Sequence, residues 1–90
     1  MPKILMLIDD DADDRELFCE AAVELDAQIV CYTAANCKQA LATLDSLKSG
    51  LPEVIFLDVS MPITNGWACL RLLKEHNVYS KIPVIMYSTS

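Results

Sequence analysis

The sequence predicts an α/β protein built on a doubly wound parallel sheet, and three observations support this fold class. Short apolar runs, each too brief for a helix, lie at residues 4–8, 54–57 and 84–87. Residues 29–33 are rich in β-branched and aromatic side chains and form a fourth candidate strand. Helical periodicity separates the candidates. Strands that alternate with helices must be parallel, with right-handed crossovers that place helices on both faces.

The first helix is expected to start near Asp13, where Asp13 and Asp14 suit the positive N-terminal end of a helix. Its apolar residues recur at a helical spacing and predict a buried face. That face consists of Leu17, Phe18, Ala21, Ala22 and Leu25.

The second helix is predicted over residues 36–49. Asn36 suits the N-cap because Gln39 follows three residues later, and Gly50 can close the helix. Its apolar stripe contains Ala40, Leu41, Leu44 and Leu47.

The third helix follows Gly66 and is expected to end near residues 76–77, before Pro83 opens the last strand. Its inward face is predicted to contain Trp67, Leu70 and either Leu73 or Leu72.

Composition limits the function classes. A chain of 90 residues favours one domain, and a net charge of -6 argues against a nucleic-acid surface. No apolar stretch approaches the roughly 18 residues that a membrane-spanning helix needs. The cysteines show no C-x-x-C spacing and no signal peptide is apparent, so we expect a reducing cytoplasm and separate thiols acting as small core residues. These are Cys19, Cys31, Cys37 and Cys69.

Acidic and hydroxyl side chains directly follow three of the predicted strands. Asp9 and Asp10 follow the first strand, Asp58 the third, and Ser88 with Thr89 the fourth. The functional crevice of such a sheet lies beyond the carboxyl ends of its strands, so these residues are expected to converge. Two carboxylates about 5 Å apart repel by roughly 3 kcal/mol at an effective dielectric near 20, which a hard cation would relieve. Magnesium is the expected ion.

Asp58 is the best placed nucleophile in this group. It ends a buried apolar run and leads into the turn-forming loop 59–62, whose backbone N–H groups can face phosphoryl oxygens. A carboxylate can attack phosphorus and form an aspartyl phosphate. Ser88 could donate a further hydrogen bond to the transferred group.

Three motifs together resemble the receiver domain of a two-component response regulator. They are the acidic pair in residues 7–10, the phosphorylation loop in residues 55–62 followed by Gly66, and residues 83–88 with a switch hydroxyl. The resemblance covers residues 1–90. It implies a flavodoxin-like sheet of strand order 2-1-3-4 and a role in phosphorelay signalling, without enzymatic activity beyond the domain's own phosphorylation and dephosphorylation.

The same resemblance implies a role for each site residue. Asp58 would accept a phosphoryl group from the phosphohistidine of a sensor histidine kinase. Asp10, Asp58 and the Ser60 backbone carbonyl would coordinate Mg2+, while Asp9 would act mainly through water. Ser88 would hydrogen-bond the phosphoryl group.

The chain also departs from the family pattern. Family members have a further helix, a fifth strand that carries a Lys, and a last helix, and Lys81 does not match that Lys. We therefore expect residues 1–90 to form the N-terminal part of a receiver domain, with the fourth strand as an exposed edge of the sheet. We also expect a fragment, a homodimer or a swapped assembly. Phosphorylation of the chain as given is expected to be impaired. Residues 13–17 and 88–90 further resemble regulators that pair with phytochrome-like kinases.

Two other site interpretations and a non-catalytic one remain open at this point. A phosphatase of the haloacid dehalogenase type would use Asp9 as nucleophile and Asp11 as acid, but it leaves Asp58 unexplained. An EF-hand-like calcium loop would use Asp9, Asp11, Asp13 and Glu20, yet Asp14 stands where Gly is required. A docking module with a degenerate pocket is the third alternative.

Overall fold

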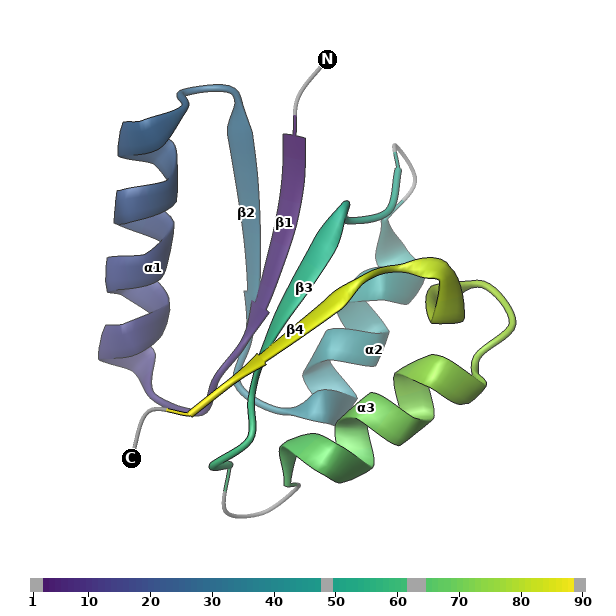
Figure 1. The fold of residues 1–90 in the computed structure, drawn as a ribbon. Helices are drawn as coiled ribbons and strands as arrows, with labels where there is room; N and C mark the ends of the chain where they lie inside the picture. Colours follow the sequence, from purple (N-terminus) through teal and green to yellow (C-terminus); the bar gives the residue numbers. More distant parts are fainter. Residues whose placement is uncertain (1–2, 48–49, 62–64, 89–90) are drawn as a thin grey trace.

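The computed structural model describes residues 3–47, 50–61 and 65–88, and it contains one parallel sheet (Figure 1). The strand order is β2-β1-β3-β4 and every pairing is parallel. Both features confirm the predicted fold class. The strands are β1 (Lys3–Ile8), β2 (Ile29–Ala34), β3 (Val54–Asp58) and β4 (Val84–Tyr87).

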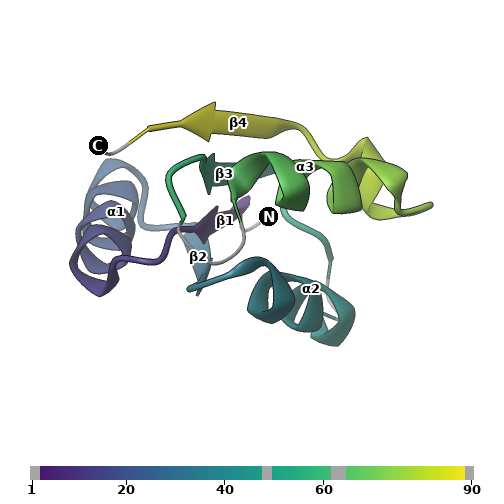
Figure 2. The same ribbon diagram turned by 90° about the horizontal axis from the view of Figure 1, so that it is seen from below.

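Helices cover both faces of this sheet. Helix α1 (Ala12–Leu25) lies on one face, and α2 (Cys37–Ser46) and α3 (Gly66–Glu75) lie on the other (Figure 2). A short 3-10 helix, η1 (Tyr79–Lys81), leads into β4. Among the described residues, no helix is long and apolar enough to cross a membrane.

Side-chain caps start the three α-helices. The Asp11 carboxylate accepts hydrogen bonds from two backbone N–H groups of α1, and the side-chain oxygens of Asn36 and Asn65 each accept one from their own helix. The N-cap prediction for Asn36 is thus confirmed. Helix α2 ends at Ser46, earlier than predicted, and residues 48 and 49 lie outside the described part.

The largest core lies between the sheet and helices α2 and α3. Alternate strand residues point to this side, and the apolar stripes of the two helices pack on them. Leu44 of α2 and Leu73 of α3 are both buried, so Leu73 rather than Leu72 faces inward. The strand residues of this core include Met6, Ile8, Ile55 and Leu57.

The predicted buried face of α1 is wrong in part. Leu17 is 63% exposed and Leu25 87% exposed, and only Ala22 of α1 is buried. Helix α1 packs mainly beside β2, and one long residue, Phe18, reaches across to the ring of Phe56 at a centroid distance of 5.0 Å. Much of the apolar face of α1 therefore has no partner in the described part of the chain.

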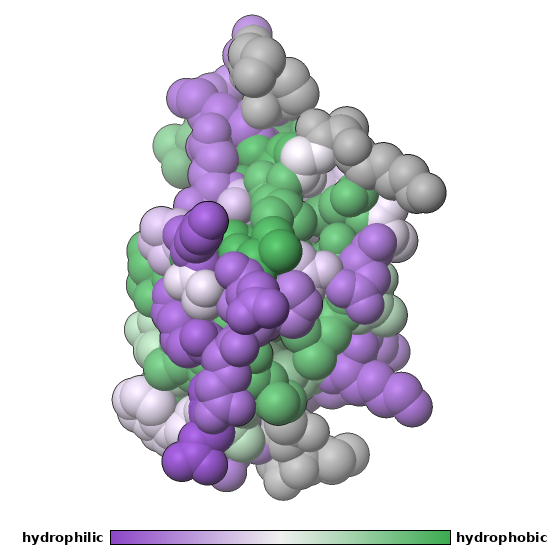
Figure 3. Space-filling view, turned by 90° about the vertical axis from the view of Figure 1, so that its right-hand side faces the viewer, coloured by the Kyte–Doolittle hydropathy of each residue, from purple (hydrophilic) through white to green (hydrophobic). Residues whose placement is uncertain are grey.

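Trp67 is also exposed, contrary to the prediction that it faces inward. The buried stripe of α3 passes through Cys69 and Leu73, four residues apart, and Trp67 lies two residues before Cys69, on the opposite side of the helix. The side of the molecule that carries α3 and η1 shows apolar patches among hydrophilic side chains (Figure 3). The exposed large apolar residues of α3 and of the segment before η1 are Trp67, Leu72 and Val78.

The cysteines lie in two disulfide pairs, which corrects the prediction of four separate thiols. Cys19 of α1 pairs with Cys31 of β2, at a Cα–Cα distance of 5.8 Å. Cys37 of α2 pairs with Cys69 of α3, at 5.6 Å. Both spacings are typical of disulfides. Spacing in the sequence gave no sign of these pairs because each joins residues from different elements.

Candidate metal and phosphoacceptor site

Three carboxylates converge at the carboxyl ends of β1 and β3. Oxygen atoms of Asp9, Asp10 and Asp58 all lie within 4.8 Å of one another. Asp9 and Asp58 are buried, and Asp10 is exposed. The predicted convergence is therefore present in the structure. We call these three residues the acidic cluster.

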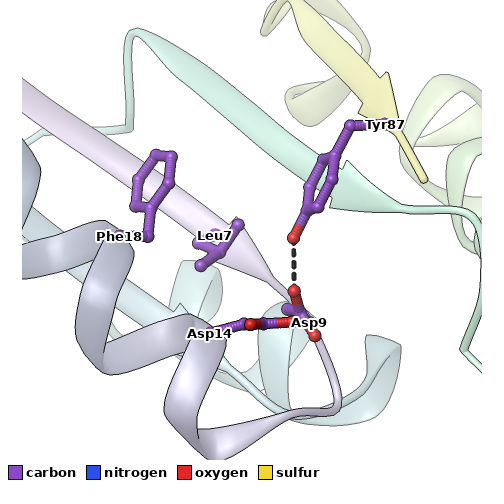
Figure 4. Close-up of a pocket in the computed structure, with 5 residues that line it drawn as sticks. All are labelled: Leu7, Asp9, Asp14, Phe18 and Tyr87. Carbon is purple, nitrogen blue, oxygen red and sulfur yellow. Dashed lines mark hydrogen bonds between the residues drawn. The ribbon is translucent and has the colours of Figure 1, made fainter. Parts of the chain in front are cut away.

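The Asp9 side chain is held at both of its oxygen atoms. Its Oδ1 accepts a hydrogen bond from the Asp11 backbone N–H at 2.9 Å, and its Oδ2 accepts one from the Tyr87 hydroxyl at 2.6 Å (Figure 4). Arg15 also donates from Nη1 to the Asp9 backbone carbonyl at 2.8 Å. Position and orientation of this carboxylate are thus fixed from α1, from its own turn and from β4.

Asp58 is the last residue of β3, and its surroundings are equally constrained. Its Oδ1 accepts a hydrogen bond from the Ser60 backbone N–H at 2.8 Å. The next backbone N–H, that of Val59, donates to the Tyr87 carbonyl at 2.9 Å. Gly66 approaches the Asp58 backbone directly. The turn after β3 is therefore fixed to β4 and to the start of α3.

Ser88 follows β4 at the same edge of the sheet. Its Oγ lies 3.2 Å from the Oγ of Ser60, within hydrogen-bonding distance, and both residues are exposed. This hydroxyl pair stands beside the turn that starts at Asp58. The sequence had suggested Ser88 as a donor and the Ser60 carbonyl as a ligand, but not a contact between the two side chains.

Tyr87 is the functional-site residue that sequence reasoning missed. The apolar run of β4 favoured a packing role for it, whereas its hydroxyl contacts Asp9. Successive side chains of a strand point to opposite faces of the sheet. That rule therefore places only one of the neighbours Tyr87 and Ser88 at the site, and the sequence favoured Ser88. The length of the tyrosine side chain allows it to reach the acidic cluster.

Negative charge accumulates around this edge of the sheet. The pKa of Asp14 is raised by burial and then by the nearby charges of Asp11, Asp9, Asp58 and Asp13. Burial, followed by the hydrogen bond to Asp9 and the charge of that carboxylate, raises the pKa of the Tyr87 hydroxyl. The hydroxyl therefore stays protonated and remains a donor.

A cavity of about 240 Å³ adjoins the acidic cluster between α1 and the end of β4. Leu7 and Phe18 form its apolar wall, while Asp9, Asp14 and the Tyr87 hydroxyl form its polar end (Figure 4). Asp9 is thus shared between the cavity and the cluster.

The donor set of the cluster fits a small hard cation. Carboxylate oxygens are the ligands that Mg2+ prefers. Two oxygens bound to one Mg2+ ion lie at most about 4.2 Å apart, because each bond is about 2.1 Å long. A cluster that spans up to 4.8 Å therefore suits direct ligation by part of the group and ligation through water by the rest.

The two alternative sites find no support in this geometry. The Asp11 carboxylate, the acid of a phosphatase of the haloacid dehalogenase type, accepts the backbone N–H groups of Asp13 and Asp14 and caps α1. The calcium-binding alternative requires a loop, whereas Asp13 and Glu20 both lie within α1.

A doubly wound parallel sheet with carboxylates at the ends of β1 and β3 and a hydroxyl after β4 has the architecture of a signalling receiver domain. The family model of the response regulator receiver domain matches residues 5–90. The chain belongs to this family, whose members are the receiver domains of two-component systems.

Known proteins agree with this assignment. A protein-glutamate methylesterase/protein-glutamine glutaminase of Bacillus subtilis is 38% identical over 85 residues, which is 94% of this chain and 22% of that protein. The phosphate regulon transcriptional regulatory protein PhoB of Pseudomonas aeruginosa is 36% identical over 84 residues, 93% of this chain and 34% of that protein. The chain thus spans between 22% and 34% of the length of these relatives.

Among solved structures, the phosphorylated cyanobacterial phytochrome response regulator RcpA superposes with a TM-score of 0.84 at 26% identity. The superposition covers 100% of this chain and 67% of that one. The arrangement of α1 to β4 in this chain is therefore that of a response regulator.

Proposed function

We propose that this domain accepts a phosphoryl group on Asp58 from a sensor histidine kinase, with Mg2+ bound at the acidic cluster. The observation that carries the proposal is the position of the Asp58 carboxylate within 4.8 Å of the carboxylates of Asp9 and Asp10. Membership of the receiver family supports the same role. In this proposal, residues 1–90 act as one domain.

The chemistry is a transfer between two nucleophiles. An oxygen of Asp58 attacks phosphorus as the phosphorus–nitrogen bond of the kinase phosphohistidine breaks, and the bonding electrons stay on the imidazole nitrogen. When bound, Mg2+ supplies positive charge that neutralises the phosphoryl oxygens.

The residues around Asp58 are proposed to coordinate the metal and to donate hydrogen bonds to the phosphoryl group. Asp10, Asp58 and the Ser60 backbone carbonyl are the proposed direct metal ligands, and Asp9 acts through water. Ser88 donates a hydrogen bond to the phosphoryl oxygens, and its contact with Ser60 Oγ keeps its hydroxyl beside the turn. The N–H of Ser60 already points at the Asp58 carboxylate and orients it.

A phosphorylation assay tests the proposal directly. The protein is incubated with a small phosphodonor and Mg2+, and the modified residue is mapped by mass spectrometry. We expect one phosphoryl group on Asp58, absent from Asp58→Asn and retained in Asp11→Asn. A label on Asp9 would overturn the proposal and favour the phosphatase alternative.

Family membership supports a proposal for the partner and for the location of this domain. A sensor histidine kinase is the proposed donor, and the similarity to a phytochrome response regulator supports a phytochrome-like kinase. The net charge of -6 supports a role for this domain that does not involve nucleic acid. The cytoplasm is the proposed location, because it is typical of this family. The domain takes part in signalling rather than in turnover of a metabolite.

A second copy of the chain is the proposed neighbour of β4. In the described part of the sheet, β4 pairs with β3 alone and forms an edge, and Ile85 is 48% exposed. Exposed edges present unpaired backbone groups that another strand can bind. Light scattering should report a homodimer or a swapped assembly. A cooperatively folded monomer at high concentration would contradict this.

A further inference from the structure

Tyr87 contacts the residues that follow β1 with its side chain and the residues that follow β3 with its backbone. Its side chain donates to Asp9 Oδ2 at 2.6 Å, and its backbone carbonyl accepts from the Val59 N–H at 2.9 Å. Its Cα is also the register partner of Asp58 across the β3–β4 pair. One residue therefore contacts the end of β1 and the turn after β3.

The hydroxyl of Tyr87 completes the hold on Asp9. With the Asp11 N–H on Oδ1, the Tyr87 hydroxyl on Oδ2 leaves the buried carboxylate little freedom to rotate. A short hydrogen bond to an ionised acceptor is among the stronger hydrogen bonds in proteins. Because Asp9 lies in the acidic cluster with Asp10 and Asp58, its orientation affects the arrangement of oxygen atoms that the cluster offers to a cation.

We propose that Tyr87 is a positioning residue of the metal site, whose hydroxyl orients Asp9 for Mg2+ binding and links the site to the strand that precedes Ser88. The inference rests on the proposed phosphoacceptor function. It adds a residue of β4 that acts through Asp9 and does not itself touch the ion. Movement at the end of β4 would then change the affinity for Mg2+, and Mg2+ would in turn restrict that strand end.

The test compares two Tyr→Phe variants that each lose one tyrosine–carboxylate hydrogen bond. Tyr87→Phe removes the bond to Asp9, and Tyr79→Phe removes the bond between Tyr79 and Asp45, which lies outside the site. Isothermal titration with Mg2+ should show a roughly tenfold weaker Kd for Tyr87→Phe, the range expected for a hydrogen bond to a charged group. Tyr79→Phe should bind Mg2+ like the wild type. An unchanged Kd in Tyr87→Phe would overturn the inference.

A phosphorylation assay separates positioning from general damage. At saturating Mg2+ the Tyr87→Phe variant should be phosphorylated at the wild-type rate. The substitution should raise the Mg2+ concentration that phosphorylation requires and leave the maximal rate unchanged. A reduced maximal rate with an unchanged Mg2+ requirement would contradict the positioning role.

A double-mutant cycle keeps the test decisive if Tyr87→Phe is destabilised. In an Asp9→Asn background, Tyr87→Phe should cause no further loss of Mg2+ affinity, because the carboxylate it orients is already gone. Additive losses would refute the inference. Failure of the wild type itself to bind Mg2+, or to accept phosphate on Asp58, would instead refute the proposed function.

Discussion

Gly66, the first residue of α3, lies so close to the backbone of Asp58 that a β-carbon on Gly66 would be 2.5 Å from the Asp58 carbonyl oxygen. The same atom would be 2.6 Å from the Cα of Val59. Both neighbours are backbone atoms, so neither can rotate away as a side chain would. The turn that carries the proposed phosphoacceptor therefore depends on a hydrogen atom at position 66.

Gly66→Ala should lower the free energy of unfolding by about 1–3 kcal/mol, the usual cost of an overpacked contact. Helix propensity alone would favour alanine by about 1 kcal/mol, so a net loss reports the clash. Urea denaturation measures the change, with Ala68→Ser on the exposed side of α3 as the control. A Gly66→Ala protein as stable as the wild type would show that the turn adjusts at no cost.

Mg2+ should stabilise the folded chain. Bound at a concentration of 100 times its Kd, it should raise the free energy of unfolding by about 2.7 kcal/mol, because the unfolded chain lacks the cluster. EDTA should reverse the increase, and Asp10→Asn should reduce it strongly. Glu24→Gln, an exposed change on α1, should leave it intact. No shift in the urea midpoint at millimolar Mg2+ would argue against a metal site.

Reduction of the two disulfides should destabilise the protein. The bonds close loops with sequence separations of 12 and 32 residues. Loop-closure entropy then assigns them about 3 and about 4 kcal/mol, respectively. Urea denaturation with and without dithiothreitol measures the loss, and non-reducing peptide mapping identifies the pairs. Alkylation of all four thiols in native, unreduced protein would contradict the pairing. In the reducing cytoplasm that we propose as the location, both cysteine pairs would be held as thiols.

Acid should weaken the contact between α1 and the start of β1. The Gln28 N–H, and then the hydrogen bond from Lys3, lower the pKa of Asp26 below its ordinary value of 3.8. A carboxyl whose pKa is lower in the folded state stabilises the fold above its unfolded pKa, and this contribution is lost as the pH falls through the folded pKa. Asp26→Asn should therefore destabilise the protein at neutral pH and make little difference at strongly acidic pH. Urea midpoints measured across that range, with Glu24→Gln as control, check this expectation. An equal loss at both ends would contradict it.

The strands and the convergence of the acidic cluster could be predicted because both follow from short-range patterns. An apolar run that ends in Asp58 predicts a buried strand, and topology then brings its end beside Asp9 and Asp10. The cap at Asn36 follows from local spacing in the same way. In each case the information lies within a few residues or in the strand order.

The missed features depend on distances between elements. The contact between Tyr87 and Asp9 depends on how far the end of β4 lies from the end of β1, across β3. The cysteine pairs depend on the separations of α1 from β2 and of α2 from α3. The exposure of Leu17 and Trp67 depends on which neighbours cover each helix. A periodic pattern states which residues share a face, but not whether another element packs against that face.

The hydrogen bond between Asp9 and Tyr87 joins residues 78 positions apart. Closing so long a loop costs entropy that is repaid only when the intervening strands are in place, so this contact belongs to the late part of folding. During synthesis the first strand and its two aspartates leave the ribosome long before β4. Until β4 has been made, Asp9 would lack the tyrosine that we propose orients it, and the Mg2+ affinity of the chain would then report completed folding.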